Sequence, residues 1–195
     1  MAALALAAAV GVGGGAGLHF AFAARSSATP QQLALPSLHG QATWRANTRR
    51  APAFPLLAAQ RGRTVLLAFM DPLCKQECPI EGRALAATER QVSVDERAAV
   101  LIVSVNPEAT AHDARAATRK WGLPADTHWQ LGTKAQLARV WRAYSITVTP
   151  TTHDIVHSTA VYVIDKRGFE RAGVLAPFMP QFVADDLRTL AREPM

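Results

Sequence analysis

The chain has 195 residues, of which 49% are hydrophobic and 18% charged. This supplies a real hydrophobic core for one domain plus an appendage, and it excludes a fold that needs disulfide staples. The net charge of +6 raises the question of nucleic-acid binding, but no basic stripe with interleaved aromatic residues is present, so a solvated basic face is the better interpretation and we predict no nucleic-acid partner.

The first 24 residues form a segment without Lys, Arg, Asp or Glu, made mostly of Ala, Leu, Val and Gly. It is long enough to span a bilayer as a helix, and Ala21-Phe22-Ala23 matches a signal-peptidase site. We therefore predict that residues 1–24 are a signal peptide or a membrane anchor. The positive charge that normally precedes such a segment is missing, which leads us to expect an upstream basic segment. The alternative is an alanine-rich tail without a membrane role.

A second region, residues 25–53, is rich in Ser, Thr, Gln, Pro and Arg and shows no sustained period. It is predicted to form a linker or an irregular lead-in. The domain itself is predicted to occupy residues 54–195.

Within this domain, buried strands alternate with amphipathic helices. In chain order we predict a strand at 64–70, a helix at 79–92, a strand at 99–105, a helix at 110–121, a short strand at 128–131, a helix from 133 to 144, a loop at 145–156, strands at 158–165 and 169–175, and a helix at 180–192. This order predicts an α/β domain in three layers.

Local signals support several of these boundaries. Gly122 is typical of a helix C-cap, and Thr133 with Gln136 forms a capping box. The helix that follows places Leu137, Val140, Trp141 and Tyr144 on one apolar face.

The two cysteines of the chain, Cys74 and Cys78, lie where the first buried strand ends and a helix begins. Two fully helical residues at this spacing are too far apart for a disulfide. With Cys74 in the loop after Asp71-Pro72 and Cys78 at the helix start, a disulfide or a shared metal becomes feasible. We also expect the helix N-terminus to lower the thiol pKa.

The spacing alone leaves several chemistries open. Two soft thiolates suit Cu(I) or zinc; zinc would need two further ligands, whereas three-coordinate Cu(I) would need one imidazole. A redox pair or a plain structural disulfide is equally compatible with the pattern.

Four segments in order resemble the SCO/SenC family (synthesis of cytochrome c oxidase). The first is the stretch 65–79, with Cys-x-x-x-Cys-Pro after a buried strand. The others are Val-Ser-Val-Asn-Pro-Glu at 103–108, the pattern from Gly132-Thr133 to Ala143-Tyr144, and Val156-His157-Ser158-Thr159 before a strand. The resemblance covers residues 53–192.

This resemblance implies a thioredoxin-like fold with a central mixed β-sheet flanked by helices. It also implies a domain outside the cytoplasmic membrane, either anchored by the N-terminal segment or secreted after cleavage. Copper, as Cu(I) or Cu(II), would be bound by Cys74, Cys78 and His157. His153 is a rival ligand, whereas His112 and His128 are expected to be surface residues.

The chain departs from the family pattern at three places in the motifs, and the β-hairpin that usually precedes the first core strand is shortened. Gln76 and Glu77 displace the usual acidic residue between the cysteines, Asn106 replaces an Asp, and Val156 replaces an Asp before the histidine. None of these changes removes an expected ligand, and together they suggest a divergent branch.

The leading functional prediction is a copper chaperone that delivers copper to a cytochrome c oxidase subunit or to another extracytoplasmic protein. The alternative is a thiol–disulfide oxidoreductase without an obligatory metal, with Cys74 attacking and Cys78 resolving the mixed disulfide. A peroxiredoxin is disfavoured because Asp71 stands where its Thr would be. A thioredoxin proper is disfavoured because Cys-x-x-Cys and a cis-proline before the last core strand are both missing from the sequence. A secreted domain with one structural disulfide is the simplest alternative.

Overall fold

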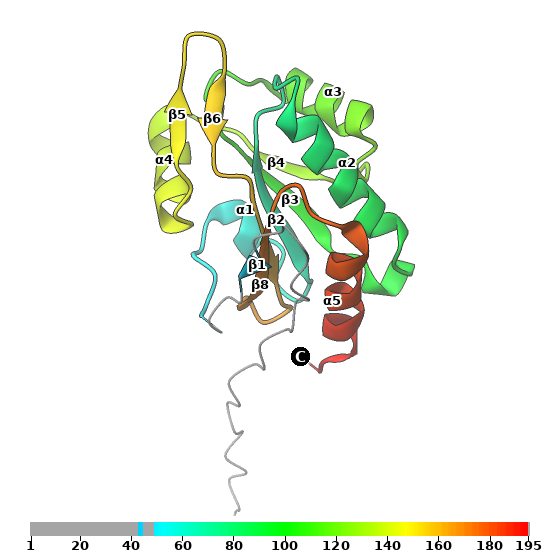
Figure 1. The fold of residues 1–195 in the computed structure, drawn as a ribbon. Helices are drawn as coiled ribbons and strands as arrows, with labels where there is room; N and C mark the ends of the chain where they lie inside the picture. Colours follow the sequence, from blue (N-terminus) through cyan, green and yellow to red (C-terminus); the bar gives the residue numbers. More distant parts are fainter. Residues whose placement is uncertain (1–42, 45–48, 195) are drawn as a thin grey trace, which may run out of the picture.

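The computed structural model describes residues 43–44 and 49–194, in which helices cover both faces of a mixed β-sheet (Figure 1). The predicted segment 1–24 and most of the predicted lead-in lie outside the described residues. The strands are β1 (Thr43–Trp44), β2 (Val65–Met70), β3 (Ala99–Ser104), β4 (His128–Gln130), β5 (Val148–Pro150), β6 (Ile155–His157), β7 (Ala160–Ile164) and β8 (Glu170–Leu175). The helices are α1 (Pro55–Ala58), α2 (Glu77–Arg90), α3 (Ala111–Trp121), α4 (Lys134–Ala143) and α5 (Pro180–Arg192), with a short 3-10 turn at Val94–Glu96.

Six of the strands form one sheet in the order β1-β8-β7-β2-β3-β4. Strand β2 is parallel to β3, which is parallel to β4, while β7 runs antiparallel to both β2 and β8. The predicted central mixed sheet is therefore confirmed. The parallel pair β2–β3 ends in register at Met70 and Ser104, so the loops that follow both strands leave the sheet at the same edge.

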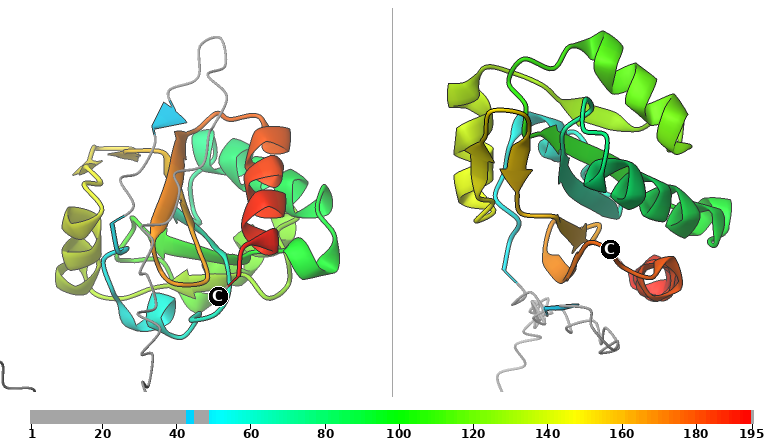
Figure 2. Two further views of the ribbon diagram at one scale, coloured as in Figure 1. Left: turned by 90° about the horizontal axis from the view of Figure 1, so that it is seen from below. Right: turned by 45° about the horizontal axis from the view of Figure 1, so that its top comes forward.

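The core consists of two apolar layers, one on each face of the sheet. Strand β2 is buried throughout, and its side chains alternate between them. Leu66 and Met70 join a cluster that includes residues of α2, α3 and α5, whereas Leu67 and Phe69 join one that includes residues of α4. Figure 2 shows α4 on one side of the sheet and α2 and α5 on the other. This is the predicted three-layer arrangement.

Most predicted boundaries agree with the structure. Thr133 and Gln136 form the capping box of α4, and Gly122 closes α3 at φ +70°. Helix α2 begins at Glu77, two residues before the predicted start, so that Cys78 lies inside its first turn. The predicted apolar face of α4 is also confirmed, because Leu137, Trp141 and Tyr144 are buried and the partly buried Val140 packs against the same cluster.

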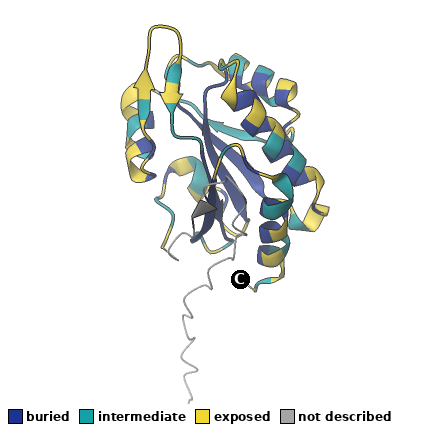
Figure 3. Ribbon diagram, viewed as in Figure 1, coloured by how far each residue is buried: buried dark blue, intermediate teal, exposed yellow. Residues whose placement is uncertain are grey.

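The predicted loop at 145–156 is wrong in part, because β5 and β6 pair there as an antiparallel hairpin. The strands have three residues each and include Pro150, so their sequence carries little strand signal. The turn is instead closed by Thr151 and Asp154, since the Thr151 backbone N–H and hydroxyl both donate to the Asp154 carbonyl. Figure 3 shows this hairpin largely exposed, in contrast to the buried central strands.

The described part of the lead-in makes contacts that the sequence did not predict. Strand β1 pairs with β8. The Ala51 N–H donates to the Gly168 carbonyl, and the Tyr144 hydroxyl donates to the Pro52 carbonyl. Hydrogen bonds therefore join both β1 and residues 51–52 of the lead-in to the domain.

Candidate metal centre

The loop between β2 and α2 is organised by Asp71. Its backbone carbonyl accepts a hydrogen bond from the Cys74 N–H (3.1 Å), and its carboxylate accepts one from the Leu73 N–H (2.9 Å). These two bonds close a tight turn directly after the buried strand. Cys74 therefore lies in the loop, half-buried, four residues before the completely buried Cys78.

The thiol of Cys78 contacts a backbone N–H group and an imidazole. Its Sγ atom accepts a hydrogen bond from the Asp71 N–H at 3.4 Å and lies 3.5 Å from Nε2 of His157. Burial raises the pKa of the Cys78 thiol far above its ordinary value, which outweighs the lowering by the Asp71 N–H; the Cys74 side chain raises it further. The expected lowering by the helix N-terminus is therefore wrong for Cys78, because desolvation dominates in this buried site.

His157 ends strand β6 and faces Cys78 with a defined tautomer. Its Nδ1 atom lies 3.0 Å from the Ser158 carbonyl oxygen. A carbonyl only accepts hydrogen bonds, so Nδ1 carries the proton and Nε2 presents its lone pair. The free lone pair is directed at the Cys78 thiol, which donates to it while protonated. The same lone pair is the one that a metal ion would use.

Within the described chain, no three His, Cys, Asp or Glu side chains are close enough together to hold a metal ion as they stand. Two of the three predicted ligands, Cys78 and His157, are in contact. Cys74 packs against the same apolar cluster as Cys78, and both thiols are free. The donor chemistry fits a soft metal, and Cys74 is close enough to Cys78 for its side chain to raise the pKa of that thiol.

The remaining histidines lie elsewhere. His153 is exposed near the tip of the β5–β6 hairpin, where its N–H donates to the Thr151 hydroxyl. His112 is exposed on α3, as expected, whereas His128 is half-buried in β4. Of the two rival histidines, it is His157 whose imidazole lies within contact distance of a cysteine.

Two polar residues beside the cysteines had no predicted role here. Nδ2 of Asn106 donates to both carboxylate oxygens of Asp71, at 3.2 and 3.3 Å. Asn106 follows β3 and Asp71 follows β2, so the parallel register brings them together. This gives a physical reason for the Asn in place of the family's Asp, because an Asp there would set two carboxylates against each other. The sequence signal that could have predicted this contact is the Asp-Pro pair after one strand and the Asn-Pro pair after the adjacent parallel strand.

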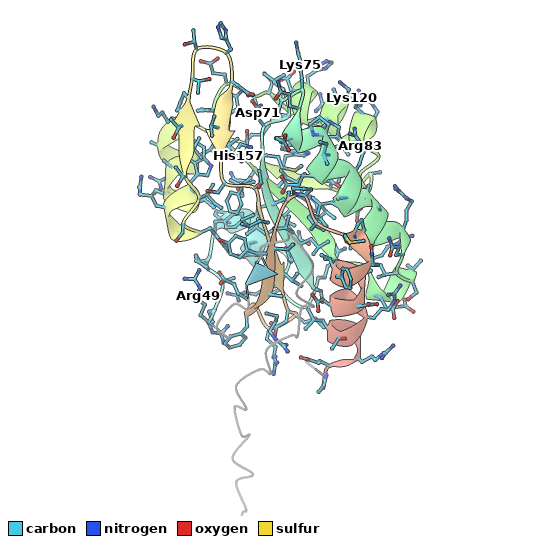
Figure 4. All side chains as sticks on the ribbon, viewed as in Figure 1. Arg49, Asp71, Lys75, Arg83, Lys120 and His157 are labelled. Atoms are coloured by element: carbon cyan, nitrogen blue, oxygen red, sulfur yellow. The ribbon has the colours of Figure 1, made fainter. Side chains whose placement is uncertain are left out.

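The surroundings of the site combine an open cavity with a buried acid. A cavity of about 570 Å³ lies between the β5–β6 hairpin and the loops after β2 and β3, with Asp71 and Leu73 among its lining residues. Figure 4 shows Asp71 and His157 in the same region, below the tip of the hairpin.

On α2, Glu81 is buried without a hydrogen-bond partner among the described residues, and burial raises its pKa to about 8.

Comparison with known proteins gives a consistent result. The family described as SCO1/SenC matches residues 57–192. A search of curated proteins finds no match.

Several solved structures share the fold. A SCO1/SenC family lipoprotein from Bacillus anthracis str. Ames is 17% identical with a TM-score of 0.62, over 69% of this chain and 85% of its own. Arabidopsis thaliana ScoI with copper bound has the same identity and TM-score, over 69% and 88%. BsSco, a member of the Sco family of cytochrome c oxidase assembly proteins for which a disulfide switch is described, is 13% identical with a TM-score of 0.60, over 71% and 86%.

Proposed function

Because this chain belongs to the SCO1/SenC family, we propose that it is a copper-binding chaperone that delivers copper to a cytochrome c oxidase subunit or another extracytoplasmic protein. Copper is its cargo and is held by Cys74, Cys78 and His157. The observation that carries the proposal is the 3.5 Å approach of the His157 Nε2 lone pair to the Cys78 thiol. Copper bound to a member of the same fold, Arabidopsis thaliana ScoI, adds support.

The charge and softness of the donors favour Cu(I). Two thiolates and one neutral imidazole give a three-coordinate site with a preference for soft ions. The Cys78 thiol must lose its proton on binding, and its raised pKa makes this costly without a cation beside it. Uptake and release of copper are therefore coupled to a proton at Cys78.

The surface around the site supports transfer to a protein partner. Leu73 precedes Cys74, Ile80 lies in the first turn of α2, and Val156 precedes His157; these side chains are 48%, 46% and 60% exposed. Large apolar side chains gathered around a reactive site are typical of a docking surface. A partner that covers them would exclude water while the metal passes between thiolates.

The location of the domain is part of the same proposal. Residues 1–24, which carry no charged side chain, would act as an anchor in the cell membrane or as a cleaved signal peptide. The domain would then lie on the extracytoplasmic side, and among the structural relatives one is a lipoprotein. Helices of sufficient length and apolarity to cross a bilayer do not occur among the residues that the structure describes.

The proposal is tested by anaerobic titration of the reduced full-length protein with Cu(I) against a competing chelator. We expect one Cu(I) per chain, with thiolate-to-metal absorption in the ultraviolet. Failure to compete with the chelator, or equal retention of zinc, would count against a copper chaperone.

A second candidate, a thiol–disulfide oxidoreductase, is favoured by the unequal exposure of the two free thiols. The Cys74 thiolate would attack a partner disulfide, forming a mixed disulfide and releasing one partner thiolate. Cys78 would then pass its proton to His157 Nε2 and attack the Cys74 sulfur, releasing the second partner thiolate. The chain ends as a Cys74–Cys78 disulfide, and the partner gains two electrons.

The oxidoreductase is tested with a model disulfide in the absence of metal. Cys74→Ser is expected to abolish exchange, while the metal-free wild-type protein stays active. If the wild-type protein exchanges disulfides no faster than free thiols do, the chaperone is the better description.

A further inference from the structure

A second cavity lies at the opposite end of the sheet from the cysteines. It measures about 440 Å³ and is formed by residues 50–65, around α1, together with the turn between β7 and β8. Five cationic side chains line it, whereas Asp165 is its one lining carboxylate among the described residues; the cations are Arg50, Arg61, Arg63, Lys166 and Arg167. This arrangement is called the basic cavity below.

The carboxylate of Asp165 is already used within the protein. It accepts hydrogen bonds from the backbone N–H groups of Arg167 and Phe169, and it pairs with the guanidinium of the buried Arg171 at 3.1 Å. It also lies 3.5 Å from the guanidinium of Arg167. Asp165 is therefore too fully engaged to neutralise the other cations of the cavity.

Three cations of the basic cavity have no carboxylate within ion-pair distance in the described part of the chain. Nη1 of Arg50 donates to the Arg167 carbonyl, and its guanidinium lies over the Phe169 ring at 4.8 Å. Nζ of Lys166 donates to the Ala191 carbonyl at 3.0 Å. Arg61 is exposed and has no side-chain partner among the described residues. Neutral groups thus hold two of these cations in place while their charge stays uncompensated.

Part of the cavity lining is apolar, which narrows the kind of anion that fits. Ala53, Leu57 and Ala58 line it beside the cations and are at least partly exposed. No aromatic side chain belongs to its described lining, so it offers no surface on which a base could stack, as a nucleic-acid groove would. Cations next to apolar groups are instead suited to a phosphate ester that carries hydrocarbon.

The place of the cavity in the fold indicates how such a ligand would orient the domain. Strand β2 begins in the cavity lining at Val65, and Asp71 follows its other end beside Cys78. Six strand residues separate the two sites by about 20 Å. Figure 4 shows Arg49 far from Asp71 and His157. Residues 50–63 also lie on the N-terminal side of the domain, toward the charge-free segment 1–24.

We propose that the basic cavity binds the phosphate headgroups of anionic phospholipids and so holds the domain on the membrane with Cys74, Cys78 and His157 facing away from it. The phosphate-binding chemistry rests on the cavity alone, while the choice of a lipid as the source rests on the proposed anchoring by residues 1–24. Each Lys or Arg next to an anionic surface strengthens partitioning about fivefold. The interaction is expected to weaken as salt is added.

The experiment measures how fast phenylglyoxal modifies individual arginines of the full-length protein with vesicles present. Phosphatidylcholine vesicles with and without phosphatidylglycerol are compared by mass spectrometry. We expect the anionic vesicles to slow modification of Arg61 and Arg63 several-fold and to leave Arg142, exposed on α4, unchanged. Because the readout is a difference between two vesicle types, it does not depend on whether residues 1–24 insert.

Matched variants distinguish the effect of this cavity from the effect of the protein's net charge. The triple substitution Arg50→Gln, Arg61→Gln and Lys166→Gln should remove the protection of Arg63. The control, Arg83→Gln, Lys120→Gln and Arg142→Gln, removes the same charges from exposed positions on α2, α3 and α4 and should retain it. Cu(I) uptake by both triple variants should match that of the wild-type protein, so this result is independent of the copper site.

The following outcomes overturn the proposal. They are equal modification rates with both vesicle types, equal loss of protection in the two triple variants, and equal protection by inorganic phosphate added to neutral vesicles. The last would assign the cavity to free phosphate. Stronger protection by duplex DNA than by anionic vesicles would likewise replace the membrane with a nucleic acid.

Discussion

The Nε2 atom of His157 lies 3.5 Å from the Sγ atom of Cys78, although 79 residues separate them in sequence. The Ser158 carbonyl holds the other ring nitrogen, which leaves the Nε2 lone pair facing the buried thiol. Strand β6 belongs to a small separate sheet, so it is the β5–β6 hairpin that brings the imidazole to the first turn of α2, where Cys78 lies.

Replacing His157 with Ala should weaken Cu(I) binding by at least about tenfold, since even groups that only orient metal ligands are worth about 10–100-fold. The measurement is the Cu(I) titration of the reduced protein against a chelator. Two control variants are His153→Ala, which removes the rival imidazole, and His128→Ala, which removes an imidazole in β4. Both should bind Cu(I) as tightly as the wild-type protein does. A His157→Ala protein with unchanged affinity would remove this residue from the site.

The two thiols should react at different rates with iodoacetamide at neutral pH. Cys74 is half-buried in a loop, whereas Cys78 is completely buried and its pKa is raised by burial, so it stays a thiol. We expect a fast phase that is absent in Cys74→Ser and retained in Cys78→Ser. The phases are followed by mass spectrometry of the reduced protein, and a fast phase that survives in Cys74→Ser would contradict the assignment.

Replacing Asn106 with Asp should destabilise the loop after β2. The change removes the amide that donates to Asp71 and places a second carboxylate beside it. We expect a loss of about 1–3 kcal/mol in the free energy of unfolding, measured by urea denaturation. Asn106→Ala removes the donor without adding charge and is the control. Only the Asp variant should regain stability as acid protonates the pair, and equal behaviour of the two variants would argue against charge repulsion.

The buried Glu81 should make the folded protein less stable as the pH rises. Burial raises the pKa of this carboxyl from 4.5 to about 8, so between these values the native state binds a proton that the unfolded state has lost. The contribution is fully present below the unfolded pKa and is lost as the pH rises through the folded pKa. The slope in this window is a loss of about 1.4 kcal/mol per pH unit.

Urea denaturation of the reduced protein across this pH range checks the Glu81 prediction. Glu81→Gln cannot ionise and should remove this part of the pH dependence. Glu77→Gln makes the same substitution at an exposed position of the same helix and serves as the control. If the slope is the same in Glu81→Gln as in the wild type, another group is responsible.

The contact between α2 and α3 should not tolerate a methyl group at Gly82. A Cβ atom there would lie 2.7 Å from Cε3 of the buried Trp121. Overpacking of this kind costs about 1–3 kcal/mol, against a gain of about 1 kcal/mol in helix propensity. We expect Gly82→Ala to lower the melting temperature and Trp121→Leu to couple with it favourably, since the clashing ring is then gone. Additive effects in the double variant would exclude a direct clash.

The local sequence was sufficient to predict the layered fold. Continuous apolar runs identified β2 and β3, because strands buried on both faces need apolar side chains at every position. Gly122 and the Thr133–Gln136 box marked helix ends, because caps depend on residues close in sequence. The likeness to the SCO/SenC family, now shown over residues 57–192, also came from short ordered motifs.

Only the tertiary structure decided the state and surroundings of the site. The helix N-terminus at Cys78 suggested a lowered thiol pKa, but burial is a property of the packed fold and has the larger effect. The pairing of Asp71 with Asn106 depends on the register of two strands, and the reach of His157 depends on a hairpin with little strand signal of its own. The basic cavity likewise joins residues about a hundred positions apart. The preference of a segment for helix or strand depends on residues that are neighbours in sequence. Burial, strand register and contacts between distant charged residues arise only when the chain packs.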